Sequence, residues 1–393
     1  MTPAARVQSA IEILDTIIEA ARSNGAPADR IIANWAKSNR YAGSKDRRAV
    51  RELVYSAIRA CGPVPKTGRG AMLRLVETGE ALAPLFDGSQ YGPPAIGRNE
   101  KPAEGGIAPK WLAEKLVASG LDESEQEALL GRAALDVRIN TLKADRGNLD
   151  LPVAGEPLAA PQAVRLPLGT QVEQWGIFRD GQVEVQDHGS QIACLAAQAQ
   201  PGETVIDLCA GAGGKTLALA AAMDNAGTLI ASDTDRGRLT KLGPRASRAG
   251  AGMVQARLLD AGRELEALAE YRGMADCVFV DAPCSGTGTL RRKPEAKWRI
   301  DERSLSRYAG IQDKLLDIAA ELVKPGGRIV FVTCSLLDEE GAGRLDAFLE
   351  RSPGWEADLP KLPAGRKHGK GMRLTPYHDG TDGFFIARAV LPC

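Results

Sequence analysis

The carboxyl-terminal half of the chain consists of short apolar runs that alternate with stretches of helical spacing. After Val183 the runs are TVIDLC, TLIAS, VQARLL, DCVFVDA, RIVFVTC and FFIARAV. They are short, rich in β-branched residues and bounded by glycine, proline or charge, which is typical of buried strands in a parallel sheet. Strands that alternate with helices indicate βα units. The pattern predicts an α/β fold whose ligands bind at the carboxyl ends of the strands.

The amino-terminal part of the chain has a helical pattern instead. Apolar residues recur at helical spacing from Val7 to Ala21, and residues 28–61 form two further helical stretches that divide near Gly43, with Ser44 as a candidate N-cap. The sequence DVRINTLKADR indicates a strand that enters a short mixed segment. We therefore expect three domains: a helical domain at 1–135, a small α/β connecting segment at 136–180 and a Rossmann-like domain at 181–393.

The charge of the whole chain indicates no partner, because 50 basic residues balance 50 acidic ones among 393. Local charge is more informative. Residues 28–75 hold eleven basic against three acidic residues, and residues 291–307 hold seven against three. Such runs are commonly solvated helix faces, but they also suit contacts to nucleic-acid phosphates. Trp298, within the second run, is expected either to stack on a base or to cover the core.

Membrane spans and targeting segments have no counterpart in the sequence. No stretch approaches the 18 or more apolar residues of a membrane helix, and the first 25 residues lack the apolar core of a signal peptide. The seven cysteines are odd in number and include no CxxC pair. This argues against a disulfide framework or a zinc site. We expect a cytoplasmic protein without metal.

A glycine-rich loop follows the first strand of the α/β pattern. The segment DLCAGAGGKT, residues 207–216, leads into an alanine-rich helix, so backbone amides can approach a ligand at the helix N-terminus. The loop is neither a Walker motif nor a regular GxGxxG. The next strands end near Asp233, Asp260 and Asp281. An acid at the place of Asp233 commonly binds ribose hydroxyls, which favours NAD or S-adenosylmethionine over NADP.

Two cysteines occur where two apolar runs end. Cys284 follows DCVFVDAP, and Cys334 ends RIVFVTC. If the two strands are neighbours, both thiols lie at the mouth of one cleft, which suits covalent attack on a substrate. Cys194 and Cys277 fit the ordinary role of small buried apolar residues. Nearby cations favour a thiolate, and the candidates are Lys215, Arg291, Arg292 and Lys293.

Three segments taken in order resemble the RNA cytosine-5 methyltransferases of the Sun/Nol1/Nop2 family: DLCAGAGGKT, DAPCSGTGTLRRKPEAKWR and LVKPGGRIVFVTCS. The segment GSKDRRAVRELVYSAIR is similar to the NusB-type helical domain of the bacterial 16S rRNA branch, and RINTLK and VQDHGSQ also match. Two places depart from the family pattern. CAGAGGKT stands where CAAPGGKT is common, and DEEG stands where EEN is common.

The resemblance implies a Rossmann-like S-adenosylmethionine methyltransferase core with an amino-terminal all-α NusB-like domain. It implies that Cys334 attacks C6 of cytosine and that Cys284 assists release of the methylated base. Asp281 is then expected to bond the edge of the base, and Lys215 to orient the base or the nucleophile. The residues implied for cofactor binding are Cys209, Ala210, Gly211, Ala212, Gly213, Gly214, Lys215, Asp233, Asp260 and Asp281.

RNA is the partner that the resemblance implies, with 16S rRNA preferred to tRNA, and we expect a monomer. Three other functions share some of these features. In a DNA cytosine-5 methyltransferase the cysteine of the Pro-Cys motif is the nucleophile, and an ENV-type motif follows it. This chain has TCS instead of the ENV-type motif. An NAD-dependent oxidoreductase needs a set of catalytic residues for hydride transfer, and the three histidines of this chain are not arranged to form one. A non-catalytic RNA-binding assembly factor does not require the pair of cysteines. The target nucleotide has no signature in the sequence.

Overall fold

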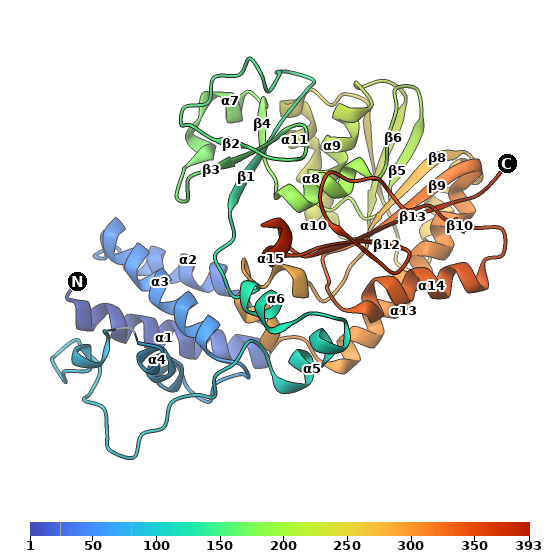
Figure 1. Ribbon diagram of the computed structural model, residues 1–393. Helices are drawn as coiled ribbons and strands as arrows, with labels where there is room; N and C mark the ends of the chain where they lie inside the picture. Colours follow the sequence, from blue (N-terminus) through green and yellow to red (C-terminus); the bar gives the residue numbers. More distant parts are fainter. Residues whose placement is uncertain (24, 80) are drawn as a thin grey trace. The chain divides into compact units, whose positions relative to one another are not determined.

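The computed structural model describes residues 1–23, 25–79 and 81–393, and the contacts divide the chain into two units (Figure 1). The helical unit comprises Met1–Arg132 and Thr289–Asp301, and the sheet unit comprises Ala133–Gly288 and Glu302–Cys393. The three consecutive domains expected from the sequence stay a prediction, and the two contact-defined units divide the chain differently. The difference arises because 289–301 packs with the amino-terminal helices and because the small sheet near residues 135–185 belongs to the same unit as the large one.

The helical unit has a core formed by apolar residues of its first four helices, among them Val7, Leu14, Val54 and Met72. The predicted helices near 28–61 are present, but Gly43 is the N-cap and Ser44 is the first helical residue. The elements are α1 (Pro3–Arg22), α2 (Ala28–Ser38), α3 (Ser44–Ala60), α4 (Gly68–Glu77), α5 (Lys110–Ala118), α6 (Glu123–Ala128) and the 3₁₀ helices η1 (Ala83–Leu85) and η5 (Pro294–Trp298).

The basic run at 291–299 contributes to this core rather than forming a continuous solvated face. Trp298 is buried among the apolar residues of the helical unit, and its Nε1 donates to the carbonyl of Gly62 at 3.2 Å. The side chain of Lys297 is fully buried and donates to the carbonyl of Ile107 at 3.0 Å. Burial lowers the pKa of Lys297 to about 7. Of the two roles expected for Trp298, the structure shows the packing role.

The large sheet of the other unit has nine strands, with the order β11-β12-β13-β9-β8-β5-β6-β7 and β10 paired to β13. The core strands β5 to β9 are parallel, as the apolar runs predict, and β13 is antiparallel to β9. The strands are β5 (Thr204–Asp207), β6 (Thr228–Asp233), β7 (Val254–Leu258), β8 (Ala275–Asp281), β9 (Val323–Thr333), β10 (Glu356–Ala357), β11 (Arg366–His368), β12 (Gly371–Leu374) and β13 (Phe384–Val390).

Helices cover both faces of this sheet. Apolar residues of α8, α9 and α11 pack on one face, and those of α13 and α14 pack on the other. The helices are α7 (Gly176–Arg179), α8 (His188–Leu195), α9 (Gly214–Ala222), α10 (Arg236–Leu239), α11 (Leu242–Ala249), α12 (Glu264–Ala267), α13 (Glu302–Leu322), α14 (Ala342–Arg351), α15 (Pro376–Asp379), η2 (Val172–Gln174), η3 (Ala269–Tyr271), η4 (Thr287–Thr289) and η6 (Asp338–Glu340).

The strand order reverses between β5 and β8, because the chain runs outward through β6 and β7 on one side and through β9 on the other. Such a switch point opens a crevice at the carboxyl ends of the strands, where ligands of doubly wound sheets bind. The glycine loop that follows β5 and the segment that follows β8 both begin at this edge. The fold thus brings the predicted cofactor and thiol segments to one edge of the sheet.

A second, antiparallel sheet precedes the large one, with the order β2-β3-β1-β4. Its strands are β1 (Leu135–Ile139), β2 (Glu156–Pro157), β3 (Ala163–Leu166) and β4 (Val183–Val185). Because side chains alternate along a strand, β1 turns Val137 and Ile139 into a small apolar core and turns Asp136 and Arg138 to its other face. Val183, where the sequence suggested that the parallel pattern begins, pairs with β1. Within the described residues, no helix combines the length and apolar character needed to cross a membrane.

Candidate active site

The glycine loop after β5 requires residues without a side chain. Gly211 and Gly213 have φ angles of 55° and 86°, in the left-handed region that favours glycine. A Cβ atom on Gly211 would come within 2.3 Å of the guanidinium of Arg238. Gly213 directly precedes α9, so the loop delivers backbone amides to the N-terminus of that helix. This cradle fits an anionic or polar part of a nucleoside cofactor.

Asp233, at the end of β6, ties the loop to the sheet. Its Oδ2 accepts from the amide of Gly211 and its Oδ1 from the amide of Asp235, both at 2.7 Å. A carboxylate has about four lone-pair sites, so these two bonds leave capacity for a ligand. The assignment of Asp233 to the ribose of the cofactor stays a prediction. Asp260 lies exposed beyond the end of β7, and its assignment is likewise untested.

Asp207, the last residue of β5, was not selected from the sequence. It is fully buried, and its Oδ2 accepts from the hydroxyl of Thr216 at 2.6 Å. Its Oδ1 is buried without a partner among the described residues. Burial raises the pKa of Asp207 to about 7. The hydrogen bond from Thr216 acts in the opposite direction but is the weaker effect. Below a pH of about 7, Oδ1 is the oxygen free to carry the proton, and a cationic donor group of a bound cofactor would favour the ionised carboxylate as its acceptor.

Replacing Asp207 with asparagine is expected to flatten the pH dependence of stability. The folded state keeps the proton of Asp207 up to about pH 7, whereas the unfolded chain releases it near its ordinary pKa of 3.8. The stability from the neutral carboxyl is therefore complete below pH 3.8 and is lost as the pH rises through 7, by roughly 4 kcal/mol. Urea unfolding between pH 4 and 8 measures this. Parallel curves for wild type and Asp207→Asn would contradict the buried neutral carboxyl.

Lys215 and Asp281 form an ion pair at the cleft edge, with 2.6 Å between Nζ and Oδ2. Burial by itself lowers the pKa of Lys215, but the charge and hydrogen bond of Asp281 outweigh it, so the pKa is raised and the ammonium is retained. The charge of Cys334 also acts on Lys215 in this direction. Lys215 further lies 5.7 Å from the ring centre of Phe384. A fixed cation thus stands within electrostatic range of one predicted thiolate.

The two thiols meet, as the sequence suggested for neighbouring strands. β8 and β9 pair in parallel, with Asp281 opposite Val332. The Sγ atoms of Cys284 and Cys334 lie 3.4 Å apart. The hydrogen bond with Cys334, followed by burial, raises the pKa of Cys284 well above its usual range. A raised pKa favours a protonated Cys284, and either sulfur can be the donor in this contact. The assignment of Cys334 as the nucleophile stays a prediction.

The other cysteines differ from this pair. Cys194 and Cys277 are buried, and burial raises the pKa of each to about 12, as expected for small apolar residues of the core. Burial also raises the pKa of Cys209 in the glycine loop. Of the cations expected to favour a thiolate, Lys215 lies in the sheet unit with the cysteines. Arg291, Arg292 and Lys293 belong to the helical unit.

Glu340 joins the two cysteine loops and was also missed by the sequence reasoning. Its oxygens accept from the amide of Ser285 at 2.8 Å and from the hydroxyl of Ser285. The Ser285 hydroxyl lies 3.3 Å from that of Ser335, and these two serines directly follow Cys284 and Cys334. Burial raises the pKa of Glu340. The only signal in the sequence was its place in DEEG, shortly after the second cysteine.

The departure at Gly341 has a steric reason. A Cβ atom at this position would come within 2.9 Å of the ring of Phe385. The glycine that replaces the asparagine common in the family pattern therefore fits the neighbouring β13, and Glu340 keeps its place beside it.

Comparison with known proteins supports the resemblance. A family model described as 16S rRNA methyltransferase RsmB/F matches residues 194–390. The probable ribosomal RNA small subunit methyltransferase B of Bacillus subtilis is 32% identical over 71% of this chain and 65% of its own length. The ribosomal RNA small subunit methyltransferase B of Xylella fastidiosa is 34% identical over 72% and 68%, respectively. The aligned part of this chain thus spans about two thirds of the length of these relatives.

Two solved structures are similar as well. PH0851 is 24% identical, with a TM-score of 0.78 over 99% of both chains, and a methyltransferase homolog protein from Pyrococcus horikoshii is 26% identical, with a TM-score of 0.59 over 71% of this chain and 98% of its own. The likeness confirms the expected fold class: a Rossmann-like core with a helical amino-terminal region that fits a NusB-like domain. The methyltransferase family also confirms S-adenosylmethionine as the expected cofactor and excludes the oxidoreductase alternative.

Proposed function

We propose that this chain, which belongs to the 16S rRNA methyltransferase RsmB/F family, transfers a methyl group to C5 of a cytosine in RNA, with 16S rRNA as the preferred substrate. The observation that carries the proposal is the pair of thiols, 3.4 Å apart at the carboxyl ends of β8 and β9. C5 of cytosine is a poor nucleophile, so the reaction needs covalent activation of the base. A pair of thiols beside a cofactor cradle supplies the groups for it.

S-adenosylmethionine supplies an electrophilic methyl group when it is bound. The loop of residues 209–215, together with Asp233, Asp260 and Asp281, would hold it. Asp207 joins this set, because its buried Oδ1 is an acceptor without a partner in the described parts of the chain and suits the amino group of the cofactor. The backbone amides at the start of α9 suit its carboxylate.

Cys334 begins the reaction by adding its sulfur to C6 of the cytosine. A new S–C6 bond forms, the C5–C6 double bond is lost, and its electron pair makes C5 enamine-like and able to take the methyl group. Lys215, an ammonium held by Asp281, stabilises the Cys334 thiolate before attack. The Asp281 carboxylate would accept a hydrogen bond from the N4 amino group of the base, and the Lys215 ammonium would offset the negative charge that the thiolate brings to the ring.

Cys284 completes the reaction by removing the C5 proton. In the free protein its pKa is raised first by its hydrogen bond with Cys334 and then by burial. Once the sulfur of Cys334 is bound to carbon, its negative charge is gone, and Cys284 can release its proton to solvent. The resulting thiolate accepts the proton from C5, the C5–C6 double bond re-forms, the S–C6 bond breaks, and Cys334 leaves as a thiolate.

A methyl-transfer assay tests this function. The full chain, incubated with labelled S-adenosylmethionine, is expected to label the 16S component of total rRNA at cytosine C5 and to leave tRNA unlabelled. Nucleoside digestion with chromatography identifies 5-methylcytidine. Label confined to tRNA would replace the substrate with tRNA but keep the chemistry, whereas no label in any RNA would support a non-catalytic assembly factor.

Replacing Asp233 with alanine is expected to weaken cofactor binding by roughly 1–3 kcal/mol, because charge-assisted hydrogen bonds are lost. Calorimetry with S-adenosylhomocysteine measures the change. Asp235→Ala is measured beside it as the competing assignment, since Asp235 caps α10 through the amide of Arg238 and should affect binding less than Asp233 does. Unchanged affinity in Asp233→Ala would show that another residue binds the ribose, and Asp235 is the next candidate for that contact.

Glu340 is proposed as a positioning residue for both thiols. Glu340→Gln removes one of the two acceptors that hold Ser285, so we expect kcat to fall roughly 10- to 100-fold, as a displacement of about 1 Å can cause. KM is expected to change little, because no substrate contact is removed. Glu339→Gln, at the adjacent position, is the control. A normal kcat with reduced thermal stability would leave Glu340 only a structural role.

A further inference from the structure

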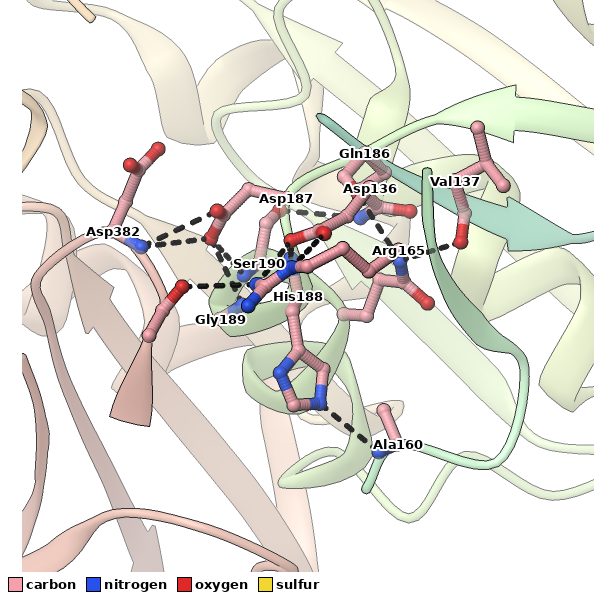
Figure 2. Close-up of polar contacts among 12 residues, drawn as sticks. Asp136, Val137, Ala160, Arg165, Gln186, Asp187, His188, Gly189, Ser190 and Asp382 are labelled. Atoms are coloured by element: carbon pink, nitrogen blue, oxygen red, sulfur yellow. Dashed lines mark hydrogen bonds and ion pairs between the residues drawn. The ribbon is translucent and has the colours of Figure 1, made fainter. Parts of the chain in front are cut away.

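The VQDHGSQ segment, residues 185–191, resembles the family pattern but contributes no residue to the proposed reaction. Its aspartate, Asp187, is the N-cap of α8 and accepts from the amides of Gly189 and Ser190 at 2.9 and 3.4 Å. The same carboxylate holds a distant segment, because the amide of Asp382 donates to both of its oxygens, each at 3.2 Å (Figure 2). Asp187 therefore joins the start of α8 to the loop that precedes β13.

This loop, residues 380–383, is held at a second point as well. The carbonyl of Gly380 accepts from Nη2 of Arg165 at 2.9 Å. Arg165 is fixed in turn by the buried Asp136 on β1, which accepts two bonds from it at 2.8 and 3.1 Å (Figure 2). Such bidentate pairs add geometric specificity as well as energy. Two charged side chains, Arg165 and Asp187, thus tie the loop to β3 and α8.

The loop brings Gly383 against the segment that follows Cys284. The amide of Gly383 donates to the carbonyl of Gly288 at 2.7 Å, and the amide of Gly288 donates to the carbonyl of Cys334 at 2.9 Å. The contact leaves no room for a side chain, because a Cβ atom on Gly383 would come within 2.7 Å of the Cα atom of Gly288. The backbone of Cys334 is therefore connected through Gly288 to the loop that Asp187 holds.

Phe384, the residue after the loop, contacts the cation of the site. Its buried ring has its centre 5.7 Å from Nζ of Lys215, the ammonium that pairs with Asp281. The ring also packs closely on Gly189 of the VQDHGSQ segment, where a Cβ atom would come within 2.8 Å of it. The loop and the start of α8 thus support both the backbone of Cys334 and the ammonium of Lys215.

We propose that Asp187 and Gly383 are positioning residues for the nucleophile Cys334. Asp187 holds the loop in place, and Gly383 fixes the segment around Gly288 that bonds to Cys334. A carboxylate suits this role, because its two oxygens can accept from the amides of α8 and from that of Asp382 together. The proposal rests on the proposed function, in which the sulfur of Cys334 attacks C6 of the base.

Gly383→Ala tests the close contact, because the added methyl group must push Gly288 away. We expect kcat of methyl transfer to fall by about a hundredfold, the cost of a displacement of about 1 Å at a reacting group. KM for RNA and the affinity for S-adenosylhomocysteine should change little, since no contact to either is removed. Gly310→Ala is the matched control and should keep the wild-type kcat, because a Cβ atom at this exposed position of α13 meets nothing within 4 Å.

Asp187→Asn tests the hold on the loop while keeping the cap of α8, because asparagine caps helices about as well as aspartate. Its amide nitrogen replaces one of the two oxygens that accept from Asp382, so a donor faces a donor. We expect kcat to fall roughly tenfold through a smaller displacement of the same loop, with little change in the unfolding temperature. A lower unfolding temperature with the wild-type kcat would leave Asp187 only a capping role and overturn its assignment.

Disulfide formation reports the position of the thiols without RNA or cofactor, so it tests the proposal even if the chain methylates no RNA. Diamide takes the two thiol hydrogens onto its N=N bond as the bond between Cys284 and Cys334 forms, and peptide mass spectrometry identifies this pair. The Sγ atoms lie 3.4 Å apart, so wild type should react readily. Both variants should react several times more slowly, because a disulfide needs a specific geometry. A wild-type rate in Gly383→Ala would overturn the contact through Gly288, and a wild-type rate in Asp187→Asn would overturn the role of Asp187.

Discussion

Cys334→Ala is expected to abolish methyl transfer to RNA, with a loss of roughly a thousandfold or more. The sulfur of Cys334 is the group that would form the bond to C6, and removal of a covalent nucleophile typically costs several orders of magnitude in rate. The measurement is incorporation of labelled methyl groups into rRNA. Cys393→Ala is the control, because Cys393 is an exposed cysteine at the end of the chain. Activity of Cys334→Ala within about tenfold of wild type would contradict the assignment.

The same variant should bind cofactor nearly as well as wild type. Cys334 follows β9, whereas the predicted cofactor loop follows β5, and β8 lies between these strands in the sheet. Calorimetry with S-adenosylhomocysteine distinguishes loss of the nucleophile from loss of the fold. A variant that loses both activity and cofactor binding would show that the substitution disturbs the sheet edge rather than the chemistry alone.

The sheet and the meeting of the two thiols could be predicted because both follow from local patterns. Apolar runs of strand length that alternate with helices indicate parallel βα units. Cys284 and Cys334 each stand where such a run ends, so pairing of β8 with β9 was enough to bring them together. The fold class and the cysteine pair therefore needed only strand order in addition to the sequence.

The supporting residues could not be predicted, because their roles depend on contacts between distant segments. Glu340 matters because its carboxylate reaches Ser285, 55 positions away. Asp207 has no distinguishing pattern in the sequence, because its role depends on its burial and on the hydrogen bond from Thr216. The place of Trp298 in the helical unit, through its bond to Gly62, also depends on tertiary packing. Hydrophobic periodicity along the chain does not predict contacts between such distant residues.

Cys284→Ala is expected to act differently from Cys334→Ala, by trapping the enzyme on its RNA. The nucleophile is still present, so the S–C6 bond forms and the methyl group is transferred. The group proposed to accept the C5 proton is missing, so elimination of Cys334 from C6 is slowed and the adduct persists. A denaturing gel with labelled RNA should show a protein–RNA band that survives heat and denaturant. The methylated adduct should accumulate in this band only when S-adenosylmethionine is present.

The double variant Cys284→Ala/Cys334→Ala is the decisive control for this band, because it retains the fold of both loops but has no sulfur to form the bond. It should give no resistant complex. The 3.4 Å contact between the thiols makes the converse result informative as well. If Cys334→Ala traps RNA and Cys284→Ala does not, the nucleophile is Cys284, and its raised pKa in the free protein would have to fall when RNA binds. The two single variants thus distinguish nucleophile from proton acceptor in one experiment.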